Sequence, residues 1–305
     1  MTDETSEPEL PRAIALAWGV AANPQRGPKR EMSIEKIVDA AIEIADAEGL
    51  GAVSMTRVAQ ALGFTTMSLY RYVTSKDDLV ALMAEAGTGL PPEPEDGLAG
   101  WRERIRFLFR AQLGVFLRHP WLLDVPIVGS PVTPNSVAWM DALLDAVAEA
   151  PVDEGERIGI ALLVTGQVRW QGIVERSYNT AAADAGVDAQ TIDDTSSRLY
   201  EELITAEEFP AMRRAVDAGV FSDPDADPLA FGFERLLDGI AAYLDARAAG
   251  TPAPEAPAEP DEPAAVTADK KVREARKQIR EAEKALRQAR KLERQMLKDA
   301  RQRLG

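Results

Sequence analysis

The 305-residue chain contains no cysteine and only one histidine, His119. Without cysteine it can form neither a disulfide nor a thiolate metal site. A single histidine leaves no histidine pair for zinc and no choice of base for a serine triad. The sequence also lacks a glycine-rich phosphate loop and a nucleophile elbow. We therefore expect a protein that is not an enzyme, with no catalytic residue, no metal and no cofactor.

Long apolar runs are also missing. No uncharged apolar run reaches the roughly 18 residues that span a bilayer, so we expect no membrane segment. The first ten residues carry four acids and no base, which is the wrong sign for a secretory signal. These features predict a cytoplasmic protein. Hydrophobic residues make up 46% of the chain and no segment shows sustained strand alternation, so the fold is predicted to be all-α.

The charge of the chain is unevenly distributed. The formal net charge is −15, yet residues 268–305 contain 14 basic and 6 acidic residues, a net charge of +8. The rest of the chain therefore carries a net charge of −23. A body this acidic repels DNA at long range, so any specific DNA contact must come from a local basic surface.

Two short helices joined by a tight turn are predicted in the first third of the chain. Met55–Leu62 has helical apolar spacing, and Gly63 follows where a left-handed backbone is needed. Thr65 and Thr66 can cap the next helix, Met67–Val73, through their hydroxyls. This arrangement is a helix-turn-helix, whose second helix enters the major groove of DNA.

Longer helices flank this motif. Ser33 is the expected N-cap of a helix that runs to Glu48, and Gly49 is its expected stop. Ser75–Asp78 has capping-box spacing and opens a helix that runs to about Ala86. The first of these helices would bury the back of the helix-turn-helix.

Residues Ile34–Leu82 resemble the DNA-binding domain of the tetracycline-repressor (TetR) family. The residues that carry the resemblance are Ala40-Ala41, Gly49, Val58-Ala59, Leu62-Gly63, Leu69-Tyr70 and Lys76-Asp77-Asp78-Leu79. Residues 101–247 resemble more loosely the ligand-binding and dimerisation domain of the same family. Residues 268–305 resemble no part of the family.

The resemblance implies an N-terminal three-helix helix-turn-helix domain and an α-helical regulatory domain, followed here by a C-terminal helical extension. We expect a short helix and a basic arm in residues 1–30, the DNA-binding domain in 31–86 and the regulatory domain in 98–249. A Pro-rich acidic linker in 250–267 and a basic helix in 268–305 complete the chain. Residues 10–18 are expected to form one or two helical turns against the DNA-binding domain.

Positions that contact DNA in the family are carried over by aligning Leu62-Gly63 and Leu69-Tyr70. They fall on Thr56, Thr66, Met67, Ser68, Tyr70, Arg71, Tyr72 and Lys76. We expect Arg71 to read a guanine edge and Met67 to touch a thymine methyl group. Tyr70, Tyr72 and Lys76 are expected to hold phosphates, which positions the protein without specifying sequence.

Four further basic residues are candidates for DNA contact. Arg57 lies within the helix-turn-helix, and the Pro/Gly-broken arm of residues 21–30 contains Arg26, Lys29 and Arg30. Such arms reach phosphates or the minor groove beside a helix-turn-helix. A flexible linker is the alternative interpretation of this arm.

Helical patterns continue through the middle of the chain. We expect helices over residues 101–118, 133–150, 153–178, 196–206, 206–219 and 229–247, with a mobile loop over 180–194. Gly159–Val174 has apolar residues on every face and is predicted to be buried all round. The resemblance implies that this helix and the last one pair with their copies in a homodimer. The alternative is that both are simply monomer core.

A small-molecule effector site is predicted among aromatic and aliphatic residues on facing helices. The candidates are Phe109, Leu113, Phe116, Trp139, Trp170, Val174 and Tyr178. An apolar cavity with a few polar groups is typical of ligand sites, although aromatic residues on amphipathic helices usually belong to the core. Because His119 is the only histidine, the metal–drug chelate of the tetracycline repressor is not the expected effector, which stays unknown.

The C-terminal helix has an apolar heptad seam. Val272, Ala275, Ile279, Ala282, Leu286 and Ala289 step by three and four residues. Three interpretations remain open: a coiled coil, a basic helix that adds DNA affinity or folds back on the acidic body, or a solvated helix without a partner.

The leading functional hypothesis is a sequence-specific, homodimeric transcriptional repressor that binds double-stranded operator DNA. Repression and release by a small molecule are what the family resemblance implies. The alternative is a DNA-binding protein without an effector, controlled by a protein partner or acting architecturally through its basic C-terminal helix.

Overall fold

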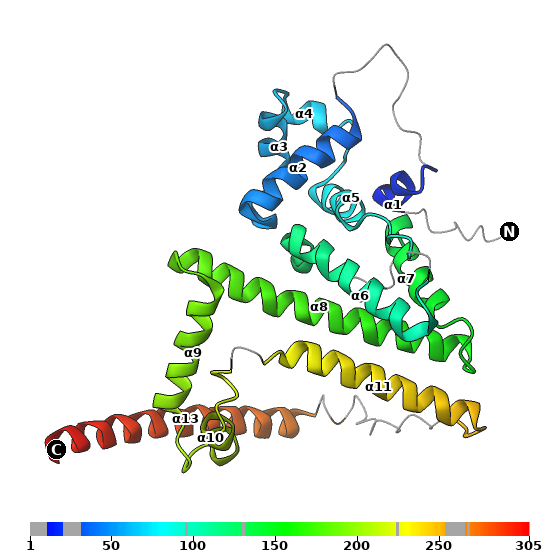
Figure 1. Cartoon of the computed structure of the whole chain (residues 1–305). Coiled ribbons are helices and arrows are strands. Elements are labelled where there is room, and N and C mark those ends of the chain that lie inside the picture. Colours follow the sequence, from blue (N-terminus) through cyan, green and yellow to red (C-terminus); the bar gives the residue numbers. More distant parts are fainter. Residues whose placement is uncertain are drawn as a thin grey trace. The chain divides into compact units, whose positions relative to one another are not determined.

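The computed structural model describes residues 11–20, 32–94, 97–127, 129, 132–223, 226–253, 266 and 269–304. Every regular element in these ranges is a helix, which confirms the predicted all-α fold (Figure 1). The chain divides into two compact units, residues 1–251 and 252–305. The first unit contains all helices from α1 to α11, and the second contains α13.

The helix-turn-helix region has four α-helices, each with a hydroxyl N-cap, and a short 3₁₀-helix, η1 (Leu50–Ala52), between the first two. The α-helices are α2 (Ile34–Glu48), α3 (Met55–Ala61), α4 (Thr66–Leu69) and α5 (Lys76–Thr88). The side chains of Ser33, Ser54, Thr65 and Ser75 each accept a hydrogen bond from the backbone N–H three residues later. Ile37, Val58, Leu69, Val73 and Leu79 are fully buried and form the core of this domain. The expected caps at Ser33 and Ser75 are thus confirmed.

The second helix of the motif is shorter than predicted. We expected a helix over Met67–Val73, but α4 ends at Leu69 and the next three residues form a turn. Ser75 adopts an extended backbone (φ −148°, ψ 168°) so that it can cap α5. Because Ser75 is extended, α4 has to end a few residues before it. The turn after Leu69 also allows Val73 to be buried in the core.

A short N-terminal helix, α1 (Arg12–Ala17), packs on α5, as expected for residues 10–18. Ala13 is its buried residue, and Met32 beyond it joins the same core. Trp18 follows α1 and donates from Nε1 to the carbonyl of Val132 at 2.7 Å. The N-terminal helix is thereby tied to both the DNA-binding region and the regulatory region.

The regulatory region follows α5. Its helices are α6 (Gly100–Arg118), η2 (Pro120–Asp124), α7 (Pro134–Ala146), α8 (Glu154–Ala185), α9 (Ala189–Leu203), α10 (Pro210–Asp217) and α11 (Pro228–Ala248). A capping box starts α8, where Asp153 and Glu156 exchange hydrogen bonds of 2.9 and 2.7 Å. Asp227 caps α11 through the N–H of Ala230 at 2.8 Å.

Several predicted boundaries were wrong. The mobile loop expected over 180–194 is almost entirely helical, because α8 continues to Ala185 and α9 begins at Ala189. Residues 181–183 and 185 are alanines, which are strong helix formers. Gly186 ends α8 in a left-handed conformation (φ +67°), and Asp188 caps α9 at once. Likewise, α7 ends at Ala146 rather than at residue 150, and α10 begins only at Pro210.

The helix α8 is not buried on all sides, contrary to the prediction for Gly159–Val174. Leu162, Leu163 and Trp170 are 54%, 52% and 56% exposed. Figure 1 shows α8 alongside α6 and α11, which cover two of its sides. Within one chain, the apolar surface of α8 exceeds what these neighbours cover.

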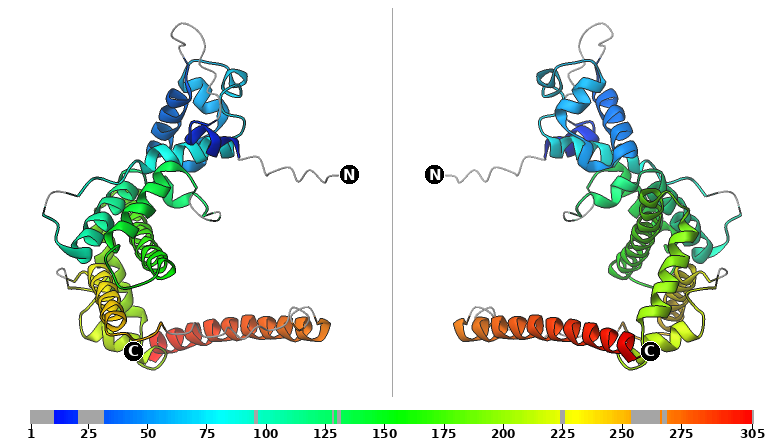
Figure 2. Two further views of the ribbon diagram at one scale, coloured as in Figure 1. Left: turned by 90° about the vertical axis from the view of Figure 1, so that its right-hand side faces the viewer. Right: turned by 90° about the vertical axis from the view of Figure 1, so that its left-hand side faces the viewer.

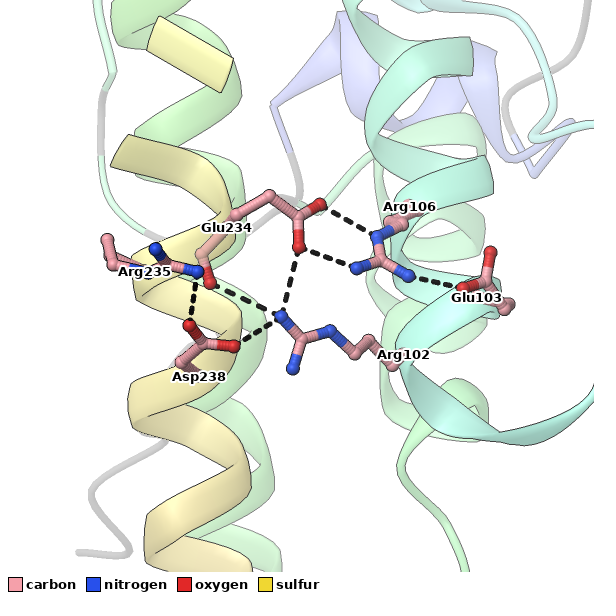
Figure 3. Close-up of polar contacts among 6 residues, drawn as sticks. All are labelled: Arg102, Glu103, Arg106, Glu234, Arg235 and Asp238. Atoms are coloured by element: carbon pink, nitrogen blue, oxygen red, sulfur yellow. Dashed lines mark hydrogen bonds and ion pairs between the residues drawn. The ribbon is translucent and has the colours of Figure 1, made fainter. Parts of the chain in front are cut away.

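Two arginines on α6 hold α11 through one carboxylate (Figure 3). Arg106 donates to Glu234 from Nε at 2.8 Å and from Nη2 at 2.5 Å. Arg102 contacts Glu234 at 3.0 Å and Asp238 at 2.5 Å. Hydrogen bonds from Arg106 and then Arg102 lower the pKa of Glu234 to about 2. The ion pairs fix the same two helices that the stacked rings of Phe109 and Phe233 join at 3.8 Å.

Replacing Glu234 by glutamine is expected to destabilise the protein at pH 7 by about 1–2 kcal/mol, since the group is only partly shielded from solvent. The folded-state pKa lies below the ordinary value of 4.5. The stabilisation is therefore present above about pH 4.5 and is lost as the pH falls towards 2. Urea unfolding at pH 7 and pH 3 should show the gap between the wild type and Glu234→Gln closing at the lower pH. Glu103→Gln, which removes one more exposed pair with Arg106, is the control and should change little.

The second unit contains one long helix, α13 (Lys270–Leu304), of 35 residues. Figure 2 shows it as an uninterrupted helix. The side chains of Ile279 and Leu286, both in the predicted heptad seam, are 57% and 52% exposed.

Candidate nucleic-acid interface and regulatory contacts

One buried residue, Leu69, and one N-cap, Thr65, fix which side chains of α4 face outward. Leu69 is fully buried, which turns Met67 and Tyr70 outward, at 74% and 42% exposed. Thr65 caps the helix by accepting from the Ser68 N–H at 3.3 Å, and its hydroxyl lies 2.9 Å from the Ser68 hydroxyl. Met67 and Tyr70 thus lie on the outward face of α4.

The residues aligned with family DNA contacts differ in their accessibility. Those that are exposed are Thr56, Met67, Tyr70, Arg71 and Lys76, and those that are half-buried are Thr66, Ser68 and Tyr72. Tyr72 packs against the hydrophobic core, so its ring is partly committed to the fold. Lys76 is the first residue of α5, where the exposed N–H groups of the helix add positive potential.

The other basic candidates are placed differently. Arg57 on α3 pairs with Glu48 at the end of α2, so part of its charge is neutralised within the domain. Arg26, Lys29 and Arg30 lie outside the described residues. The described surface around α4 thus relies on Arg71 and Lys76 for its positive charge.

The predicted effector residues do not share one environment. Phe109 and Trp139 are buried in packing contacts, and Trp139 donates from Nε1 to the carbonyl of Gly89 at 3.0 Å. Leu113, Phe116 and Val174 are half-buried on α6 and α8, two helices that pack together. Trp170 and Tyr178 are 56% and 37% exposed. Of the predicted effector residues, Leu113, Phe116 and Val174 are thus half-buried on two helices that pack together, whereas Trp139 is buried and joins α7 to the residue that follows α5.

A group of contacts that the sequence analysis missed joins the DNA-binding and regulatory regions. Asp46 on α2 accepts a hydrogen bond from Trp121 Nε1 at 2.7 Å. His119 Nδ1 lies 2.8 Å from the same carboxylate oxygen, a hydrogen bond that requires the proton on Nδ1. Trp121 is only 2% exposed, and a Cβ added at Gly87 of α5 would lie 3.0 Å from its ring. The ring thus fills the space between α2, α5 and η2.

Two more sets of contacts hold the elements around Trp121. Asn135, at the start of α7, donates from its backbone N–H to Glu85 Oε1 and from Nδ2 to the Glu85 carbonyl, both at 2.8 Å. Arg169 on α8 donates to the carbonyls of Leu123 and Val125 at 2.8 and 3.0 Å. Burial lowers the pKa of Arg169, and neighbouring Arg176 adds to this effect.

These contacts form a continuous path from α8 to α2. Arg176 contributes as well, donating to the Pro120 carbonyl at 3.1 Å and pairing with Asp124 at 2.8 Å. Partners in this path are separated by 44 to 75 residues in the sequence, so no local pattern indicates them. These contacts connect α8 to the helix-turn-helix region through η2 and Asp46.

Within the described part of the chain, no helix has the length and apolarity to cross a membrane. The same residues hold no group of three or more His, Asp or Glu side chains arranged to bind a metal ion.

Comparison with known proteins agrees with this architecture. Residues 37–83 match the family model "Bacterial regulatory proteins, tetR family", and residues 92–244 match "Tetracyclin repressor-like, C-terminal domain". The HTH-type transcriptional repressor DrrR1 of Streptomyces coeruleorubidus is 32% identical over 244 residues, which cover 78% of this chain and 88% of the relative. An HTH-type transcriptional regulator of Saccharopolyspora erythraea is 29% identical over 213 residues, covering 68% and 84%.

Solved structures show the same fold. The TetR family protein ActR of Streptomyces coelicolor in complex with actinorhodin is 26% identical and superposes with a TM-score of 0.56, covering 70% of this chain and 96% of ActR. Both domains of the chain thus match in sequence and in structure, and the resemblance drawn from the helix-turn-helix is confirmed. The chain belongs to the tetR family of bacterial DNA-binding transcriptional regulators.

Proposed function

We propose that this regulator is a homodimeric repressor that binds an operator through α4 and releases it when a small molecule binds its regulatory region. The observation that carries the proposal is the exposed face of α4, set on a fully buried Leu69 and capped by Thr65. The proposal assigns the protein no catalytic step. The protein is proposed to act in the cytoplasm, where bacterial chromosomal DNA lies.

Sequence reading is assigned to two side chains of the α4 face. Arg71 presents a fork that fits the O6 and N7 atoms of guanine, and Met67 offers an apolar contact for a thymine methyl group. Tyr70 and Lys76 hold phosphates on either side and fix the orientation of α4 in the groove. Residues 1–267 carry a net negative charge that repels DNA at long range. Much of the affinity must therefore come from short-range contacts of these side chains with bases and phosphates.

The dimer interface is assigned to the uncovered faces of α8 and α11. Ile158, Leu162 and Trp170 recur at intervals of four or eight residues along α8 and are 45%, 54% and 56% exposed. Phe231 on α11 is 63% exposed. Apolar stripes this exposed on two neighbouring helices are typical of a subunit interface. A two-fold dimer also presents two copies of α4 to two operator half-sites.

The effector is proposed to bind beside the half-buried side chains Leu113, Phe116 and Val174, between α6 and α8. The relative DrrR1 is named a repressor, and ActR was solved with actinorhodin bound. A ligand here would press on α8, whose Arg169 and Arg176 hold η2. An effector that favours one state by about 100-fold supplies roughly 2.7 kcal/mol of coupling, which is within the usual allosteric range.

Selection of bound DNA fragments followed by footprinting tests the proposal. The wild type is expected to protect a palindromic site, and Arg71→Ala to weaken that site at least ~30-fold because two guanine contacts of about 1–3 kcal/mol each are lost per dimer. Arg198→Ala is the control, since Arg198 is an exposed arginine on α9, outside the DNA-binding region, and its loss is expected to have a small effect on the protected site. A wild type that protects no preferred sequence would overturn the repressor proposal.

A further inference from the structure

The helix α13 has an unusual distribution of charge. Residues 270–304 contain 14 basic and 5 acidic residues in one uninterrupted helix. Because α13 is a single helix, the register of each residue fixes the face on which it lies. Ordinary solvated helices mix both signs around their surface.

Ten of the 14 basic residues share one stripe. Written as a heptad with Val272 at position a, they occupy every b and f position of the helix. The members of this basic stripe are Lys270, Arg273, Lys277, Arg280, Lys284, Arg287, Lys291, Arg294, Lys298 and Arg301. They alternate strictly between lysine and arginine, at spacings of three and four residues. Neighbouring b and f positions lie side by side on a helix, so the stripe is continuous.

The acidic residues of α13 avoid the basic stripe. Glu274, Glu281 and Glu283 lie beside its first half, where Lys277 approaches Glu281 at 4.0 Å. From Lys284 onward, the c and e positions that border the stripe are held by Gln, Arg and Leu. The side chains of Lys270, Arg273, Arg280 and Lys284 are all exposed. By sequence register the stripe therefore contains a single sign of charge along the whole helix, and after Lys284 no acidic residue occupies the positions that border it.

The face opposite the stripe is the apolar seam, which is too weak to define the partner by itself. Its a positions are Val272, Ile279 and Leu286, and its d positions in these heptads are alanine. The helix contains no aromatic residue. A helix that lies in a membrane surface needs a broad apolar face, typically with Trp, Phe or Leu. The basic stripe is thus the stronger recognition feature, and it fits a linear polyanion better than a lipid surface.

We propose that the basic stripe of α13 binds the phosphate backbone of double-stranded DNA outside the bases contacted by α4. The ten residues span about 47 Å of helix, with one positive charge per roughly 5 Å. B-DNA carries a phosphate about every 1.7 Å of its axis, so each side chain has several phosphates within reach. This inference rests on the proposed DNA binding by α4 and assigns the extension a separate, sequence-independent role.

The charge of the body explains why such an element is useful. Residues 1–267 carry a net charge of −23, which slows association with DNA and weakens it at low salt. A cationic helix tethered through residues 252–269 is held near the DNA once either part is bound, which raises its effective concentration. The extension would thus strengthen binding to any duplex and leave the choice of operator to α4.

Two charge-matched variants of the full-length protein test the proposal. Arg280→Gln/Lys284→Gln/Arg287→Gln removes three charges from the stripe, and Lys271→Gln/Arg276→Gln/Arg290→Gln removes three from elsewhere on the same helix. Glutamine is a good helix former, and circular dichroism verifies that the helix is retained. Binding to a 40-base-pair duplex of arbitrary sequence is followed by fluorescence anisotropy across a range of KCl concentrations.

The stripe variant is expected to bind the duplex roughly tenfold more weakly at low salt. The slope of log K against log salt should fall by about 2–3 per chain, near 0.9 for each lost phosphate contact. The off-stripe variant should change the slope by less than about 1. Equal effects of both variants would overturn the proposal, because net charge rather than the stripe would then be responsible. Tighter duplex binding by the stripe variant would also overturn it, by showing that the stripe is occupied by the acidic body.

The Arg71→Ala variant separates this inference from the proposed function. It should abolish preference for the operator while leaving the salt dependence on the arbitrary duplex nearly unchanged. If the protein binds an operator and the stripe variant has no effect, DNA binding by α13 is refuted and the repressor proposal stands. Stripe-dependent duplex binding without any preferred sequence would refute the repressor and retain the role of α13.

Discussion

Replacing Leu162 by aspartate is expected to convert the protein from a dimer into a folded monomer. Leu162 is 54% exposed in a single chain, so the change removes little from the monomer core. In a two-fold interface the substitution would place unpaired carboxylates in a desolvated apolar contact, which costs several kcal/mol. Light scattering coupled to size exclusion should show the mass falling to half, and affinity for an operator should fall at least ~100-fold because only one half-site can then be bound at a time.

Leu203→Asp is the matched control for this experiment. Leu203 lies on α9 and is 65% exposed, but it is outside the stripe formed by Ile158, Leu162 and Trp170. It should leave the mass unchanged. If both Leu162→Asp and Trp170→Asp remain dimeric, the two-fold interface does not lie on this face of α8. The two copies of α4 would then be spaced by a different interface.

Features encoded by short-range chemistry were predictable from the sequence. The helix starts at Ser33, Ser75, Asp153 and Asp227 all follow from a capping side chain and its backbone partner three residues later. The apolar spacing of α2 likewise predicted its buried face, including Ile37 and Ala41. The order of the domains followed from the family resemblance, which was recognised in the helix-turn-helix around the turn between α3 and α4.

Features that depend on long-range packing were not predictable in this way. Trp170 and Trp139 were both predicted as effector contacts from the same local pattern, but their environments differ: Trp170 is exposed on α8, and Trp139 is buried and donates to the Gly89 carbonyl. An aromatic residue on an amphipathic helix gives the same local pattern in a core, a pocket or an interface. The contact between Asp46 and Trp121 joins residues 75 apart, and each has an unremarkable local sequence. Only the packing of η2 against α2 brings them together.

Trp121→Ala is expected to have the largest effect on stability of any single substitution considered. The side chain is 2% exposed, packs on Gly87 and donates to Asp46, so its loss leaves a cavity and removes one of the two donors to the Asp46 carboxylate, the other being His119. The free energy of unfolding should fall by about 3–5 kcal/mol. Trp121→Phe keeps most of the ring but removes the Nε1 donor, and should cost about 1–3 kcal/mol. Urea unfolding followed by circular dichroism measures both.

Trp18→Ala provides a close comparison within the same protein. Trp18 also donates from Nε1 at 2.7 Å, in its case to the Val132 carbonyl, but it is 49% exposed. Its loss should cost no more than about 1–1.5 kcal/mol, because little apolar area is uncovered. Similar losses for the two tryptophans would mean that η2 does not hold the DNA-binding region. The expected difference would make Trp121 the main anchor between η2 and the DNA-binding region, which the proposed release of DNA by a ligand beside α8 requires.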